Sequence, residues 1–144
     1  MHMVRFMLGS VGLFLLLGLA GCDSGPKRPE VKPAEGKFTI KGKPYAGVIL
    51  VFHPSDPAMK DVPMPRATTE ADGSYKLTTF AAYDGGMPGE YKVVAMVESV
   101  MSPLMMKGSK PPAIPATYQK AETTTLTATI GTAEKNTLPD LNIP

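Results

Sequence analysis

The chain has 144 residues, with 15 Lys and Arg against 13 Asp and Glu, 14 Gly, 15 Pro and one Cys. A formal charge of +2 is too small for a nucleic-acid-binding protein, and a single cysteine excludes an internal disulfide. Glycine and proline leave room only for short elements separated by turns, which excludes a helical bundle and fits one small domain.

The first 22 residues have the pattern of an export signal. One basic residue, Arg5, precedes a run without charged residues over positions 6–22. This run ends in Leu-Ala-Gly-Cys at positions 19–22, which resembles the lipobox of bacterial lipoproteins. The resemblance implies that residues 1–21 form a signal peptide, with a signal helix. It also implies that Cys22 is the site of lipid attachment, where acyl chains such as palmitate anchor the exported protein to the bacterial cell membrane.

One alternative is a retained membrane-spanning helix over residues 6–22, because 17 uncharged residues lie at the lower limit for a span. Asp23 resembles an inner-membrane retention signal of some bacteria, but the choice between inner and outer membrane stays open. Residues 22–35 are expected to be the acylated cysteine and a proline-rich tether that can reach about 40 Å at roughly 3.1 Å per residue.

From residue 36 to residue 144 the pattern predicts a single β domain. Short alternating runs are separated by turn residues, and the apolar run at 48–52 is typical of a central strand. Asp72-Gly73 lies between two alternating segments, which predicts a hairpin. The expected strands lie at 37–41, 48–52, 66–69, 74–79, 90–97, 125–130 and 137–143. Seven such strands indicate an all-β, antiparallel Greek-key sandwich of the immunoglobulin-like type.

Five short motifs stand out along the β domain: Gly36-Lys37 with Gly42-Lys43-Pro44, Val51-Phe52-His53-Pro54, Thr69-Glu70-Ala71-Asp72-Gly73-Ser74-Tyr75, Pro88-Gly89-Glu90-Tyr91-Lys92-Val93 and Ile114-Pro115-Ala116-Thr117-Tyr118. Together they resemble the motifs of small bacterial lipoproteins that carry a carboxypeptidase-regulatory-like, transthyretin-like domain. The resemblance spans nearly the whole predicted mature chain and implies a β-sandwich without an established activity.

Transthyretin-like folds include a branch of ring-opening hydrolases, and this chain departs from its pattern. That branch needs two histidines, an arginine and a C-terminal Tyr-Arg-Gly-Ser, whereas the predicted mature chain has His53 alone and ends in Leu-Asn-Ile-Pro. We therefore predict no enzyme and no catalytic residues. The alternative is an envelope hydrolase with an unrecognised site around His53, which would need a serine or carboxylate beside that ring.

No metal or cofactor is predicted either. The Met96–Met106 segment contains four methionines and, together with His53, could hold cuprous copper, but its spacing does not repeat as metal motifs do. Methionine also fills irregular gaps in cores. Asp72, Asp84 and Glu90 lie in expected loops without the spacing of a calcium-binding EF-hand.

Four tyrosines are the candidate residues for binding: Tyr45, Tyr83, Tyr91 and Tyr118. If they emerge together, they could stack on a glycan or a peptide; the alternative is that they are half-buried in the sandwich. The sequence therefore predicts a lipid-anchored, non-catalytic β-sandwich that serves as a structural or interaction protein of the bacterial cell envelope. Its expected partners are the membrane, through Cys22, and an envelope protein or glycan, with no nucleic acid.

Overall fold

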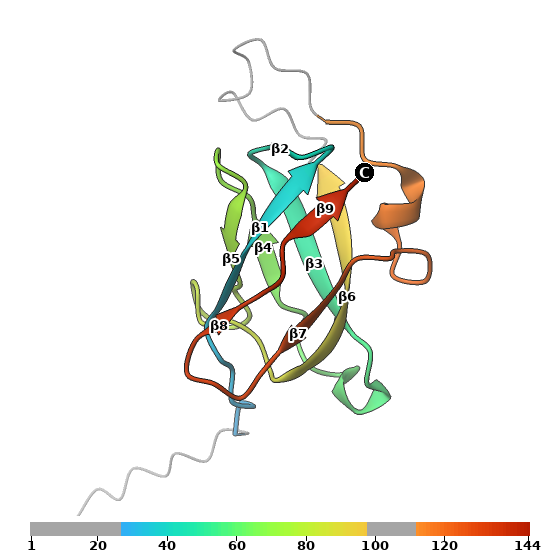
Figure 1. Ribbon diagram of the computed structural model, residues 1–144. Coiled ribbons are helices and arrows are strands. Elements are labelled where there is room, and N and C mark those ends of the chain that lie inside the picture. Colours follow the sequence, from blue (N-terminus) through green and yellow to red (C-terminus); the bar gives the residue numbers. More distant parts are fainter. Residues whose placement is uncertain (1–26, 98–111) are drawn as a thin grey trace, which may run out of the picture.

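The computed structural model describes residues 27–97 and 112–144, in which the chain is mainly β and forms two sheets (Figure 1). The predicted signal helix and Cys22 lie outside these residues. So do most of the residues between Met96 and Met106.

The first sheet is built around β1 (Ala34–Ile40). Along one edge of β1 lie β2 (Lys43–Pro44) and β5 (Ser74–Lys76), both antiparallel to it. Along the other edge lie β8 (Asn136–Thr137) and β9 (Leu141–Ile143). Because β1 has partners on both edges, its backbone is hydrogen-bonded to neighbouring strands on both sides.

The prediction of a wholly antiparallel seven-stranded sandwich is wrong for the C-terminal strands. Both β8 and β9 run parallel to β1, and the described part of the chain contains nine strands. The chain crosses between the sheets after residue 130, so it arrives beside β1 in the same direction as β1. An alternating pattern predicts a strand, but it does not indicate whether the neighbouring strand runs parallel or antiparallel to it.

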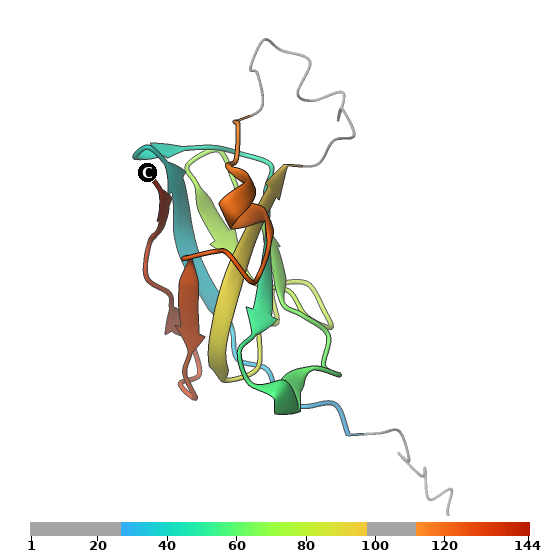
Figure 2. The same ribbon diagram turned by 90° about the vertical axis from the view of Figure 1, so that its right-hand side faces the viewer.

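The second sheet has the order β4-β3-β6-β7, and all its strands are antiparallel (Figure 2). The run predicted to be a central strand is β3 (Val48–Pro54), which lies between β4 (Arg66–Thr68) and β6 (Gly89–Val97) as expected. The edge strand β7 is Thr127–Ile130. Two short 3₁₀ helices, η1 (Pro57–Met59) and η3 (Ala116–Gln119), lie in the loops before β4 and β7.

The hydrophobic core lies between the two sheets, which gives the described part a sandwich-like form. At its centre Phe52 of β3 contacts Tyr75 of β5 and Tyr91 of β6, with ring centroids 6.1 Å and 6.2 Å apart. Alternate residues of each strand point inward, as the pleat requires. The largest fully buried side chains are Tyr75, Tyr91, Phe38, Phe52, Leu50, Leu77, Ile130, Ile143, Val48 and Val93.

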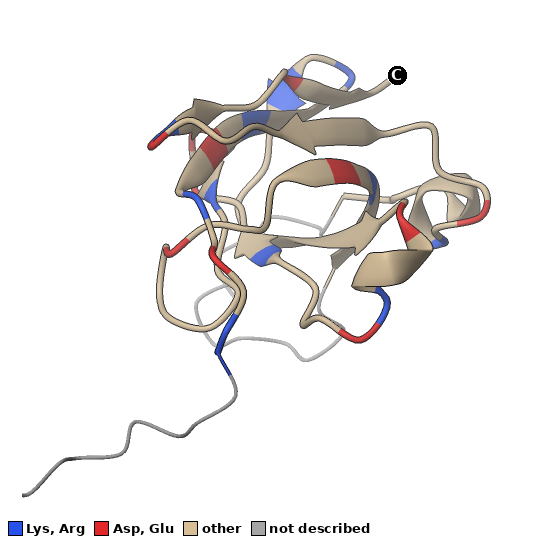
Figure 3. Ribbon diagram, turned by 90° about the horizontal axis from the view of Figure 1, so that it is seen from below, with Lys and Arg blue, Asp and Glu red and all other residues tan. Residues whose placement is uncertain are grey.

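The last residues of the expected tether lie against the domain. The amide of Lys32 donates to the carbonyl of Gly86 at 2.8 Å, and the amide of Gly86 donates back at 3.1 Å. The residue before Gly86 has to be glycine, because a Cβ on Gly85 would lie 1.8 Å from the Lys32 carbonyl oxygen. The chain then enters β1 at Ala34. Figure 3 looks onto this end of the sandwich, which is the end away from β2 in Figure 1.

Candidate functional site

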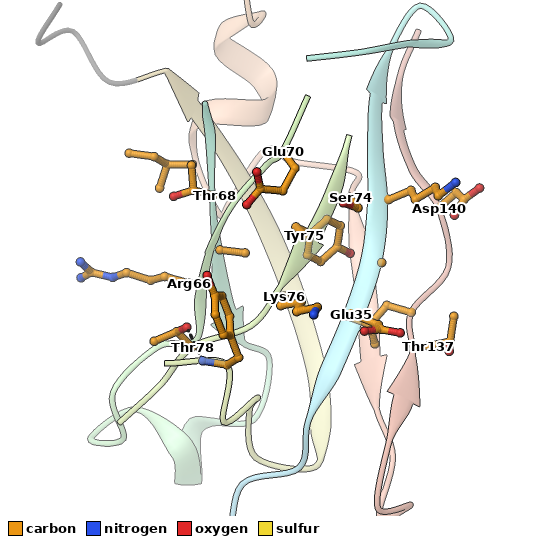
Figure 4. A pocket seen from close by; sticks show the side chains of 16 residues that line it. Glu35, Arg66, Thr68, Glu70, Ser74, Tyr75, Lys76, Thr78, Thr137 and Asp140 are labelled. Atoms are coloured by element: carbon orange, nitrogen blue, oxygen red, sulfur yellow. Dashed lines mark hydrogen bonds between the residues drawn. The ribbon is translucent and has the colours of Figure 1, made fainter. Parts of the chain in front are cut away.

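A hollow of about 860 Å³ lies along β4 and β5, where the two sheets meet (Figure 4). We call it the β4–β5 hollow. The residues that line it come from β1, β3, β4 and β5, from the loops before and after β5, from β8 and from the segment between β8 and β9. The charged ones are Glu35, Lys37, Arg66, Glu70, Lys76 and Asp140.

The hollow exists because a hairpin is divided between two sheets. The backbones of Arg66 and Thr78 exchange two hydrogen bonds of 2.9 Å and 2.8 Å, and the Glu70 amide donates to the Ser74 carbonyl at 2.8 Å. Between these two contacts, Thr68 and Lys76 occupy opposite positions, but β4 pairs with β3 and β5 pairs with β1. The two arms therefore separate between the contacts at their ends, and this opens the hollow.

The turn that closes this hairpin is the predicted Asp72-Gly73. Gly73 has a φ of +78°, which glycine adopts at little cost. The Asp72 carboxylate accepts from the Ser74 hydroxyl at 2.6 Å and from the Ser74 amide at 2.9 Å, and these contacts lower the pKa of Asp72. This aspartate therefore serves the turn, and the sequence located the turn correctly.

Tyr75 is the most deeply buried polar side chain of the β4–β5 hollow. Its side chain is 1% exposed, and its hydroxyl has no hydrogen-bond partner among the described residues. The ring lies over Gly36 of β1, where a Cβ would be 2.6 Å from the hydroxyl oxygen. Burial, and to a lesser degree the negative charge of Asp140, raises the pKa of Tyr75 above its ordinary value of 10. At neutral pH this hydroxyl is therefore protonated and is a poor nucleophile.

The charges around the hollow are mixed in sign, with three carboxylates and three cations among its lining residues. The Glu35 carboxylate also forms an ion pair with the Lys135 ammonium at 2.7 Å, and this contact lowers the pKa of Glu35. Such a rim provides no strong field of one sign that would select an anionic or a cationic ligand.

The four candidate tyrosines do not come together. Tyr83 lies at the rim of the β4–β5 hollow and is 63% exposed. Tyr91 is buried, and its hydroxyl donates to the Met87 carbonyl at 2.7 Å; burial raises the pKa of Tyr91 to about 12. Tyr45 and Tyr118 are half-buried against the core.

The loop that carries Tyr83 is held by Asp84, whose role the sequence did not indicate. The Asp84 carboxylate accepts from the amides of Thr79, Phe80 and Ala81 at 2.7, 2.9 and 2.9 Å. Partial burial raises the pKa of Asp84, but these backbone donors outweigh it and hold the pKa below its ordinary value of 3.8. Spacing could have suggested an Asx-type turn here, because Asp84 precedes two glycines.

His53 lies at the end of β3, half-buried and opposite Lys92 in the pairing with β6. It is not among the residues that line the β4–β5 hollow. Over residues 27–97 and 112–144, no three side chains of His, Cys, Asp or Glu are grouped closely enough to bind a metal ion. In the same ranges, no helix is long and apolar enough to cross a membrane.

Met96 lies near the end of β6 with 40% of its surface exposed, whereas Met101, Met105 and Met106 fall outside the described residues.

No family model matches the chain, and comparisons with curated proteins and with solved structures found no match.

Proposed function

We propose that this chain is an exported, lipid-anchored and non-catalytic β-sandwich that acts as a structural or interaction module of the bacterial cell envelope. The observation that carries the proposal is the sequence Leu-Ala-Gly-Cys at 19–22, which ends an uncharged run and stands before the packed domain whose first core residue is Ala34. We further propose that the domain is a transthyretin-like, carboxypeptidase-regulatory-like sandwich with Greek-key connections. The two-sheet architecture and the Asp72-Gly73 turn support this part of the proposal.

The chemistry of the β4–β5 hollow supports a role without catalysis. Covalent catalysis needs a nucleophile within hydrogen-bond reach of a base. The deeply buried hydroxyl of Tyr75 has no such partner in the described part of the chain. The Ser74 hydroxyl donates its hydrogen bond to the Asp72 carboxylate within the turn. A rim of balanced charges and one exposed aromatic ring is better suited to contacts with a partner than to the stabilisation of a charged intermediate.

A second candidate function is recognition of a glycan or peptide through Tyr83. The exposure of this ring at the rim of the hollow favours it, since amphipathic aromatic rings often mark binding surfaces. A Tyr83→Ala variant would then lose retention by isolated cell-wall material, while Tyr118→Ala, outside the hollow, would keep it. Equal retention of both variants would argue against this second function.

The anchoring is tested by a Cys22→Ser variant expressed in a bacterium with a labelled fatty acid. The substitution should abolish the acyl label and leave the precursor with residues 1–21 attached. Ser24→Ala, two residues away, is the matched control and should mature normally. A wild-type protein that partitions into membranes without an acyl label would instead show that residues 6–22 are a retained span.

A further inference from the structure

The end of the sandwich where the tether enters displays apolar side chains on its loops. Among the described residues, the exposed large apolar side chains are Tyr83, Met64 and Met96, and the first two belong to this end. Tyr83 lies in the loop that leads to Gly86, and Met64 precedes Pro65, whose ring would contact a Cβ on Gly86. Gly86 is the residue that pairs with Lys32 of the tether.

The tether keeps this end close to Cys22. Lys32 is hydrogen-bonded to Gly86, and the Arg28 guanidinium lies 5.6 Å from the centre of the Phe80 ring. Arg28 is six residues from Cys22 in the sequence. Six residues span at most about 20 Å when fully extended. An acyl anchor on Cys22 would therefore hold the loop within about 20 Å of the lipid surface, which is about half the reach that the whole tether would allow.

The loop at residues 79–86 is built to expose its tip rather than to bury it. Asp84 fixes three successive backbone amides, and the Tyr83 amide donates to the Thr78 hydroxyl at 3.0 Å. Tyr83 itself has a φ of +61°, a conformation that costs free energy in a residue other than glycine. Ala81 and Ala82 beside it are exposed. The fold thus holds a small apolar tip in a fixed position, with a phenol that can remain in contact with water.

We propose that this loop, with Ala81, Ala82 and Tyr83 exposed at its tip and Phe80 half-buried beside them, rests on the surface of the membrane that carries the acyl chains. Tyrosine favours the boundary between lipid and water, because its ring is apolar and its hydroxyl is polar. The Lys76 ammonium lies 5.7 Å from the Tyr83 ring centre, so a positive charge accompanies this ring. The sandwich would then stand with its tether end on the lipid and with β2 pointing away from it. This inference rests on the proposed anchoring through Cys22.

The contact depends on apolar and aromatic groups more than on charge. Figure 3 shows Lys and Arg as well as Asp and Glu along the described loops and strands at this end of the sandwich. A lipid surface fits better than a protein partner, because the anchor places that surface within reach of the loop. Several acyl chains would hold the protein on the bilayer, but they would leave the domain free to rotate, and the loop contact would set its orientation.

The test uses the full-length, acylated protein in vesicles of phosphatidylcholine and phosphatidylglycerol. Acylation consumes the Cys22 thiol, so Ala82→Cys introduces one free thiol for a spin label at the tip of the loop. The matched control, Ala46→Cys, is exposed beside β2 at the other end. Collision of each label with a water-soluble nickel complex is measured with the protein in vesicles and then in detergent-free nanodiscs.

At position 82 the nickel collision rate should be at least about twofold lower than at position 46, as expected for a group at the lipid boundary. Replacing Phe80 and Tyr83 together by serine should remove this difference, with the circular dichroism spectrum unchanged. Equal accessibility at positions 82 and 46 in an acylated protein would overturn the loop contact and leave the anchoring intact. A mass spectrum without acyl chains on Cys22 would refute both proposals.

Discussion

Removing the hydroxyl of Tyr75 should not destabilise the protein, in contrast to the usual result of a Tyr→Phe substitution. This hydroxyl is buried and has no partner in the described part of the chain, whereas the hydroxyl of Tyr91 donates to the Met87 carbonyl at 2.7 Å. A buried donor without a partner costs about 1–3 kcal/mol. Tyr75→Phe relieves that cost and leaves a void of about one methyl group, worth roughly 1 kcal/mol. The expected result ranges from no change to a gain of about 2 kcal/mol.

Tyr91→Phe is the matched control, because it removes the same atom from a ring in the same core. It should lose about 0.5–1.5 kcal/mol, the net contribution of one hydrogen bond. Both values come from urea unfolding of the two variants and the wild type. Thermal unfolding should agree, at about 4–8 °C per kcal/mol for a domain of this size. A Tyr75→Phe variant that loses as much stability as Tyr91→Phe would show that the Tyr75 hydroxyl has a partner, and the reasoning would be refuted.

Three further substitutions test the turn, the buried polar contacts and the loop at the tether end. Gly73→Ala should cost several times more than Gly42→Ala in thermal unfolding; both residues have positive φ, but a Cβ meets a backbone oxygen at 2.4 Å at Gly73 and nothing within 4 Å at Gly42. Equal losses would mean that φ alone decides the cost. Thr69→Val should lose about 1–3 kcal/mol in urea unfolding, since this buried hydroxyl accepts one backbone bond at 2.9 Å and donates another at 2.6 Å. Asp84→Asn should be less stable than wild type at neutral pH, and the gap should close on acidification. A lowered folded-state pKa gives stability above the ordinary value of 3.8 that is lost as the pH falls. A gap that stays constant with pH would contradict the role of the charged carboxylate.

Side-chain alternation located most of the strands of this domain, but it missed the short strand β2 and joined β8 and β9 into one segment. The apolar run at 48–52 is central in its sheet, and Tyr75 and Leu77 both point inward, as the period of two requires. The direction of β8 and β9 could not be predicted, because it depends on which strand lies beside them in space. Asn142 shows the difference: its side-chain oxygen accepts from the Thr39 hydroxyl at 2.9 Å, a contact over 103 positions of sequence.

The candidate site was predictable only in part. Asp72-Gly73 located the turn, but nothing local indicates that its two arms pair with different sheets and so open the β4–β5 hollow. Tyr91 could be placed inside from its alternation with Val93, whereas the exposure of Tyr83 follows from the hydrogen bonds of its loop. His53, the one histidine of the predicted mature chain, lies outside the residues that line the hollow.

The intact mass of the protein purified from bacterial membranes tests the central proposal most directly. The account predicts a chain that begins at Cys22, with its mass increased by a diacylglyceryl group and with no trace of residues 1–21. A protein that retains residues 1–21, or one that is cleaved elsewhere and carries no lipid on Cys22, would contradict it.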